Sequence, residues 1–174
     1  MMTDHEAIIS KLNLYGLGVD SQRWDLFDQV FTEYVDADFG GSAHWKNLAQ
    51  FKADFAAFHA PFDATQHVMT NHNVRVMGDR AHSLTYGSWR LIRHGTEGGP
   101  LWDGTGWYDD EWARLHSGWH IRKRVCRVVW SIGNDRVKET IPGVSFDTVY
   151  DSLKGEAQAG HLSFLNAIDA RDVD

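Results

Sequence analysis

The sequence predicts an α+β domain in which a cone-shaped, curved antiparallel sheet wraps around N-terminal helices and leaves an internal pocket. Apolar residues follow helical spacing through the first 31 residues and again over 48–58. From residue 65 to residue 130 the chain instead shows long runs rich in Val, Thr, Tyr and Trp, separated by short glycine turns. Helices followed by hairpin-linked strands are typical of the α+β class. So few strands cannot close into a barrel, and the sheet is expected to keep an open mouth.

Two helices are predicted at the start of the chain. The apolar stripe of residues 8–19 recurs at three- and four-residue steps, and Thr3 or Asp4 can cap this first helix. A second helix is predicted over 21–31, capped by the serine that opens it. Asp20 therefore lies at a helix–helix junction, beside the apolar stripe.

A strand and a third helix complete the N-terminal part. Over residues 33–39 the period of apolar residues changes to two, which predicts a strand that ends at Gly40-Gly41. A third helix follows Asn47, with large apolar residues at helical spacing, and Pro61 stops it.

The middle of the chain predicts two hairpins. Residues 65–77 and 81–93 flank a Gly-Asp turn, and residues 104–115 and 119–130 flank a His-Ser-Gly turn. Residues 94–103 contain three glycines and a proline and are predicted to form the loop between the hairpins.

The C-terminal part carries a weaker signal. We expect residues 1–130 to form the domain and residues 131–174 to form an extension that packs on it. Two short helices are predicted at 144–153 and 156–170. This tail is expected to dock on the domain or to act as a lid over the pocket mouth.

Composition narrows the function classes. Hydrophobic residues make up 43% of the 174 residues, enough for the core of one domain, and eight Trp, nine Phe and five Tyr suggest a thick core or an aromatic cavity. The net charge of −7 argues against nucleic acid and anionic membranes as partners. The single cysteine, Cys126, fits a reducing compartment. With no signal peptide or membrane span predicted, we expect a cytoplasmic location.

Asp20 and His67 are the strongest candidate pair for chemistry. Asp20 closes the first predicted helix, and His67 opens the first strand of the first hairpin. A carboxylate that holds an imidazole in one tautomer leaves the other ring nitrogen free to take a proton, which makes a general base without metal or cofactor. The alternative interpretation is a capping carboxylate and an unrelated, half-buried strand histidine.

Three segments carry a resemblance to a known family. They are the end of the first helix with the residues after it, the start of the first hairpin, and the last hairpin: Val19-Asp20 with Trp24-Asp25-Leu26 and Phe31; Thr65-Gln66-His67 with Asn71; and Tyr108–Trp112 with Gly118–Ile121. Over roughly residues 6–130 the chain resembles the SnoaL-like branch of the cone-shaped superfamily named after nuclear transport factor two. Scytalone dehydratase, lindane dehydrochlorinase and the bile-acid dehydratases are the members it resembles most.

The resemblance implies site residues. In the enzymes of this family an Asp and a His form the catalytic dyad, which implies Asp20 and His67 here. Tyr15 matches a tyrosine of the bile-acid dehydratases, although a tyrosine on the apolar stripe also suits core packing. A second histidine, found in scytalone dehydratase, is missing because Gly87 falls near its position.

Family members also use an arginine on the last long strand, and Arg124 matches it best. Arg127 has the opposite strand parity and is expected to face away from the pocket. Arg124 can also belong to a solvated basic cluster. Asn71, Trp24 and Trp89 complete the candidate site as substrate contacts, although Asn71 can equally bond its own turn.

These observations together predict a cofactor-independent lyase or isomerase, such as a dehydratase or a polyketide cyclase. Its substrate is expected to be a small, apolar or aromatic, cyclic molecule, and neither a metal nor a cofactor is expected. The alternatives are a non-catalytic domain that binds small molecules or oligomerises, and an accessory subunit similar to the small subunits of ring-hydroxylating dioxygenases. A homodimer or homotrimer is expected, with Trp89 or Trp112 on the outer sheet face as interface candidates.

Overall fold

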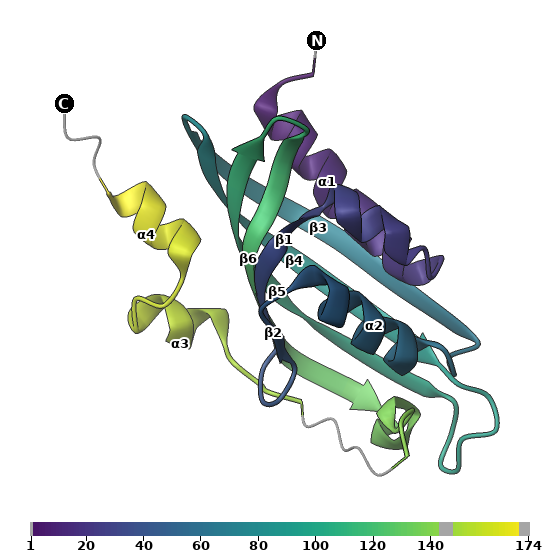
Figure 1. Cartoon of the computed structure of the whole chain (residues 1–174). Coiled ribbons are helices and arrows are strands. Elements are labelled where there is room, and N and C mark those ends of the chain that lie inside the picture. The colour runs from purple at the N-terminus through teal and green to yellow at the C-terminus, as the bar shows by residue number, and fades with distance from the viewer. Residues whose placement is uncertain (1, 143–147, 171–174) are drawn as a thin grey trace.

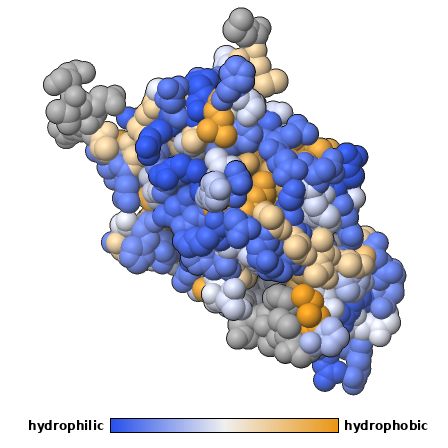
Figure 2. All heavy atoms as spheres, in the orientation of Figure 1, coloured by the Kyte–Doolittle hydropathy of each residue, from blue (hydrophilic) through white to orange (hydrophobic). Residues whose placement is uncertain are grey.

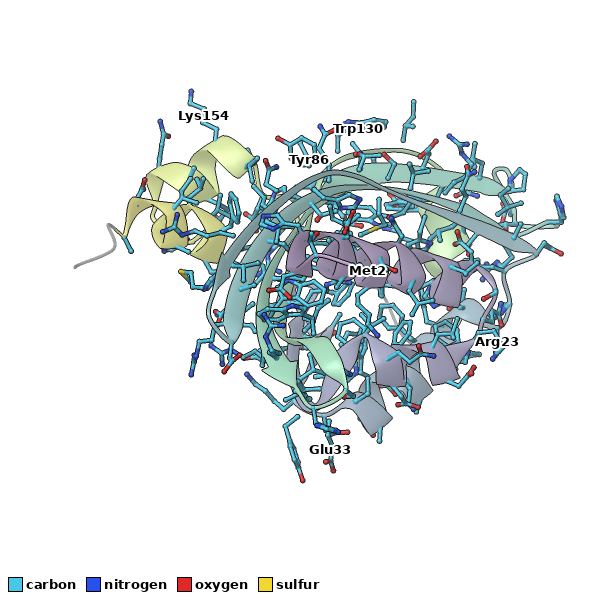
Figure 3. The ribbon with its side chains drawn as sticks, turned by 90° about the horizontal axis from the view of Figure 1, so that it is seen from above. Met2, Arg23, Glu33, Tyr86, Trp130 and Lys154 are labelled. Carbon is cyan, nitrogen blue, oxygen red and sulfur yellow. The ribbon has the colours of Figure 1, made fainter. Side chains whose placement is uncertain are left out.

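The architecture is one six-stranded, curved and unclosed sheet with helices on its concave side, which confirms the predicted α+β class. A computed structural model describes residues 2–142 and 148–170. The strand order is β2-β1-β6-β5-β4-β3. Seen from above, the sheet bends around α1, whereas α3 and α4 lie outside the curve (Figure 3).

The first and third predicted helices are confirmed. α1 (Asp4–Asp20) begins at Thr3, whose hydroxyl accepts the Glu6 N–H while the Glu6 carboxylate accepts the Thr3 N–H. α2 (Leu48–His59) begins at Asn47, whose side chain caps the Gln50 N–H. Both helices present their apolar stripes to the sheet. The helical face in Figure 2 is accordingly mostly hydrophilic, with scattered apolar residues.

The predicted second helix over 21–31 is wrong in type and extent. Only a short 3₁₀ helix, η1 (Trp24–Gln29), forms there, and Phe31 already belongs to a strand. Ser21 does not start it: its hydroxyl and its N–H both bond back to the Leu17 carbonyl and close α1. Gln22 then takes a positive φ of 52°, which turns the chain out of the helix.

Four strands, β3 to β6, form a meander, and β1 and β2 extend the sheet beyond β6. Both predicted hairpins are confirmed, and β3 to β6 pair antiparallel in chain order. β1 departs from the expected antiparallel sheet because it pairs with β6 in parallel. No hairpin joins β1 to β6, so no turn fixes their relative direction. The six strands are β1 (Phe31–Asp38), β2 (His44–Trp45), β3 (Ala64–Met77), β4 (Arg80–Ile92), β5 (Leu101–Leu115) and β6 (Gly118–Gly133).

The C-terminal extension contacts both sides of the sheet. The 3₁₀ helix η2 (Asp135–Lys138) adds the fully buried Val137 to the main core. The predicted helix over 144–153 lies partly outside the described residues, and residues 148–152 are not helical. α3 (Leu153–Gln158) and α4 (Ser163–Asp169) follow.

α4 docks on the convex face, where a second apolar cluster joins Leu162 and Phe164 to Leu84 and Trp107. The Asp109 carboxylate accepts the backbone N–H groups at the start of α4, at 2.6 and 3.0 Å. This contact ties α4 to the outside of the sheet.

The expected interface tryptophans are not on the outer face. Trp112 is fully buried and Trp89 is 6% exposed, because both share the strand parity of the inward-facing Tyr108. The apolar residues that stand on the convex face are instead Tyr86 and Trp130, at 39% and 50% exposure (Figure 3). In the described part of the chain no helix is long and apolar enough to span a membrane.

Candidate active site

A cavity of about 350 Å³ lies between the concave face of the sheet, α1, α2 and the extension. Its size is in the range of small-molecule sites. The wall is mainly aromatic and aliphatic. Polar groups are contributed to it by Tyr15, His59, His67, Trp89, Tyr108 and Lys138, among others. The pocket predicted inside the sheet therefore exists, and the extension contributes to its wall through Lys138, Thr148 and Val149.

Asp20 and His67 are hydrogen-bonded. The Asp20 Oδ1 lies 2.7 Å from the His67 Nδ1, and the Asp20 Oδ2 accepts the His67 backbone N–H at 2.7 Å. The Thr65 hydroxyl donates to the same carboxylate at 2.8 Å. A carboxylate can only accept here, so Nδ1 carries the proton and Nε2 keeps its lone pair. The His67 ring lines the cavity, and its side chain is 6% exposed.

The environment keeps Asp20 charged. Burial raises the pKa of Asp20, but the hydrogen bonds and charge of His67, with the bond from Thr65, outweigh it and hold this pKa below its usual value. Asp20 does not itself line the cavity; it lies behind the His67 ring. The carboxylate thus fixes the tautomer through Nδ1 and leaves Nε2 of the imidazole available to a ligand.

Close packing of α1 on β3 brings the pair together. A Cβ atom on Gly16 would lie 3.4 Å from the His67 carbonyl oxygen, so the helix and strand backbones already nearly touch there. Asp20 follows one turn later at the helix end. A side chain larger than a methyl group at Gly16 would therefore meet β3 and push α1 away from it.

Tyr15, Tyr108 and Trp89 form the aromatic wall opposite His67. The Tyr15 ring stands edge-on to the His67 ring, with centroids 6.3 Å apart, and lies 5.8 Å from the Tyr108 ring. The Trp89 Nε1–H donates to the Tyr108 hydroxyl at 2.5 Å. Burial raises the pKa of both tyrosines well above the usual value, so both remain neutral phenols that can donate a hydrogen bond.

Arg124 does not line the cavity, which corrects the expectation that it contacts substrate. Its side chain is fully buried and makes a bidentate pair with Asp110, at 2.7 and 2.8 Å. The guanidinium lies 4.3 Å from the centre of the Tyr15 ring and 4.4 Å from that of Tyr108. It therefore forms a layer behind the two tyrosines. Arg127 has the opposite parity, as expected, and pairs with Asp38 and Asp151.

Two predicted substrate contacts lie outside the cavity. Trp24 packs against Phe27, Phe55 and His59 and does not line the cavity. Asn71 is exposed at a bulge in β3, where its φ of 51° fits an asparagine better than most residues. Asn71 thus lies away from the cavity, whereas Trp89 does line it.

Gly87 leaves room for the aromatic wall. A Cβ at this position would lie 2.7 Å from the Tyr108 ring and 2.9 Å from the Trp89 ring. A histidine at this position would displace both rings, so Gly87 is matched to Trp89 and Tyr108.

Sequence reasoning missed several polar residues of the cavity wall, among them Asp54, His59 and Lys138. His59 continues the Phe51–Phe55 stripe of α2 by one more turn, and this spacing could have revealed it. Lys138 is 8% exposed, contacts Asp135 at 3.0 Å, and lies 4.9 Å from the Trp102 ring centre. No motif marks Lys138 in the sequence.

The curved, unclosed sheet around helices is a fold that this chain shares with a solved protein of the superfamily named after nuclear transport factor two. That protein, from Salmonella enterica, superposes with a TM-score of 0.60 and 17% identity, covering 82% of this chain and 97% of the other. The family model of the SnoaL-like domain matches the sequence of this chain over residues 1–125. This chain belongs to the SnoaL-like family, which confirms the resemblance.

Two further solved structures share the fold. One is a candidate scytalone dehydratase from Novosphingobium aromaticivorans, with a TM-score of 0.67, 14% identity, and coverage of 84% of this chain and 93% of that one. The other is a hexachlorocyclohexane dehydrochlorinase, with a TM-score of 0.64, 17% identity, and coverage of 81% and 91%. At these identities the likeness establishes the fold alone.

Proposed function

We propose that this protein is a cofactor-independent lyase or isomerase that removes a proton from a small, largely apolar, cyclic substrate. The observation that carries the proposal is the 2.7 Å bond between the Asp20 carboxylate and the His67 Nδ1, with the same imidazole forming part of the cavity wall. Two structural neighbours named for elimination reactions, a candidate dehydratase and a dehydrochlorinase, support this reaction type.

The proposed step begins at the Nε2 of His67. This nitrogen takes a proton from the carbon next to a carbonyl group, and the electron pair of that C–H bond moves toward the carbonyl oxygen. The imidazolium that forms is stabilised by Asp20, already hydrogen-bonded to Nδ1. Proton transfer by a positioned base contributes on the order of 10²–10⁴-fold.

The tyrosines complete the proposed chemistry. The Tyr15 phenol, kept neutral by burial, donates a hydrogen bond to the developing oxyanion or a proton to a departing hydroxyl group. If hydroxide leaves from the neighbouring carbon, that proton turns it into water and a C=C bond remains; the proton held by the His67 imidazolium then returns to the Tyr15 phenolate and restores both residues. If nothing leaves, returning the proton to another carbon gives isomerisation. Arg124 acts behind Tyr15 as a positioning residue, because its positive charge stabilises negative charge that develops on or near the Tyr15 hydroxyl group.

Deuterium exchange tests the base without knowledge of the substrate. We expect the wild-type protein to exchange the α-protons of a bicyclic ketone such as 1-tetralone or 2-tetralone in D₂O, followed by NMR. His67→Ala should lower the rate by about 10²–10⁴-fold, and Asp20→Asn should also lower it, because the tautomer is no longer fixed. Circular dichroism checks that the fold is intact.

His72 gives the matched control. It lies on β3 like His67, is half-buried and contacts Thr85, outside the cavity. His72→Ala should leave the exchange rate unchanged. Equal rates in His67→Ala and wild type would rule out the proposed base. Tight ketone binding with no exchange in any variant would instead favour the binding-domain alternative.

A further inference from the structure

We propose that His59 is a specificity-determining residue that accepts a hydrogen bond from a hydroxyl group on the ligand. The substrate class is thereby narrowed to cyclic molecules that carry a hydroxyl donor near the carbon that reacts at His67. The identity of that carbon rests on the proposed function. The selection of a hydroxyl group is a binding property and does not require turnover.

The hydrogen bonding of His59 leaves one ring nitrogen without a partner. Its Nδ1 lies 2.7 Å from the Phe55 carbonyl oxygen, one turn back in α2. A carbonyl only accepts, so Nδ1 carries the proton and Nε2 is an acceptor. Within residues 2–142 and 148–170, no hydrogen bond engages this Nε2.

The His59 side chain is surrounded by aromatic rings except on the side that faces the cavity. Its ring packs against Trp24, Phe55, Phe58 and Phe62, with centroids 5.0 to 5.7 Å away, and the residue is 3% exposed. The remaining surroundings are the cavity that His59 lines. The Nε2 of His59 is not one of the fully enclosed side-chain atoms that lack a partner in the described residues, so a molecule in the cavity can reach it and supply its hydrogen bond.

His59 can accept but not supply a proton at neutral pH. Burial, with a smaller contribution from the nearby His67, lowers the pKa of His59 to about 4, so the ring is neutral at pH 7. A neutral imidazole with its only N–H bound to the backbone cannot protonate a leaving group. The hydroxyl group that it binds is therefore retained in the product rather than expelled.

The two histidines set the spacing of the ligand groups. Their ring centroids are 6.3 Å apart, with planes inclined at 46°. The two imidazoles therefore lie close enough for one small ligand to contact both. The expected ligand presents a hydroxyl group to His59 and an acidic C–H to His67, inside a wall that is mainly apolar.

Two probes that differ only in the donor test this assignment. We expect 2-naphthol to bind the full-length wild-type chain, by isothermal titration calorimetry, better than 2-methoxynaphthalene. His59→Phe keeps the ring shape but removes the acceptor, and should lower the naphthol-to-methoxynaphthalene affinity ratio by about tenfold, the value of one hydrogen bond in a buried site. His72→Phe is the matched control and should leave the ratio intact, because His72 lies outside the cavity.

A measurement on the wild-type protein avoids dependence on variant folding. The ¹⁵N resonance of the His59 Nε2 should shift when 2-naphthol is added and stay in place with 2-methoxynaphthalene. A ratio unchanged in His59→Phe, a shift confined to His67, or no binding of either probe at millimolar concentration would overturn the inference. Each of these outcomes is independent of the deuterium-exchange result, so failure of one proposal does not mask the other.

Discussion

Asp20 and Asp110 each hold one basic side chain of the sheet, but in opposite surroundings. Asp20 reaches from the end of α1 to His67 and keeps 25% of its side chain exposed, with the imidazole open to the cavity. Asp110 faces Arg124 across the β5–β6 ladder, and both side chains are fully buried. Tyr15 separates the two pairs, since its ring contacts His67 on one side and Arg124 on the other.

This difference indicates which of the two pairs can act as a base. A base must change its protonation state and touch a ligand, and only the Asp20 pair offers a titratable nitrogen to the cavity. The Asp110 pair cannot give up its charge without leaving the other charge buried and unpaired. It fixes the inner face of the sheet against which Tyr15 and Tyr108 stand. The comparison predicts opposite balances of activity and stability when each pair is changed.

The largest expected effect on stability comes from breaking the buried pair. Arg124→Met leaves the Asp110 carboxylate buried without its partner, which should cost about 3–5 kcal/mol in the free energy of unfolding. Urea denaturation at pH 7 measures it. A loss below about 1 kcal/mol would show that Asp110 finds water or another partner, and the two pairs would then be less different than the structure indicates.

Replacing both members sharpens the same comparison. The double variant Asp110→Leu/Arg124→Met removes both charges and fills the space with apolar atoms, and should recover stability to within about 1–2 kcal/mol of wild type. Deuterium exchange should fall only modestly, because Tyr15 loses the cation behind its ring but His67 is unchanged. A double variant as unstable as Arg124→Met would contradict this account.

The smallest expected effect on stability comes from changing the Asp20–His67 pair. Asp20→Asn should cost about 1 kcal/mol at pH 7, since the hydrogen bonds persist in weaker form. The folded-state pKa of Asp20 is lowered, so its contribution is fully present above the unfolded value and is lost as the pH falls through the folded value. The difference in Tm between wild type and Asp20→Asn should therefore shrink from pH 7 to pH 3. A difference that grows on acidification would contradict the lowered pKa.

Local patterns were enough to predict most of the fold. The caps at Thr3 and Asn47 and the period-two runs around Gly78 and Gly118 are encoded within a few residues, so the helices and hairpins could be read from sequence. The parallel pairing of β1 with β6 was not predictable this way, because it joins segments about 90 residues apart that no turn links.

The candidate site was predictable only in part. Asp20 and His67 could be paired because each closes or opens an element, and the family resemblance supplied the link between them. The burial of Arg124 behind Tyr15 depends on which partner, Asp110 or a ligand, receives its guanidinium, and strand parity alone does not decide that. His59 escaped notice because a histidine on an aromatic helical stripe looks like ordinary packing.

The family match and the cavity do not end at the same residue. The SnoaL-like model covers residues 1–125, whereas Lys138, Thr148 and Val149 of the extension also form the cavity wall. The Asp20–His67 pair, proposed as the base, thus lies in the part shared with the family, and part of the cavity wall lies in the extension. Substrate preference is accordingly expected to follow the extension more than the dyad.

The short bridge between the extension and β6 has a consequence for how copies of this chain behave in a crowded solution. The last register position of β1 on β6 is Asp38 opposite Val125, so beyond it the β6 backbone would present free N–H and C=O groups. Val149 and Asp151 occupy that edge, bonding the Val128 N–H and carbonyl at 3.3 and 3.0 Å. An open strand edge is a template for pairing with another chain. The extension therefore covers part of an edge with which another chain could otherwise pair.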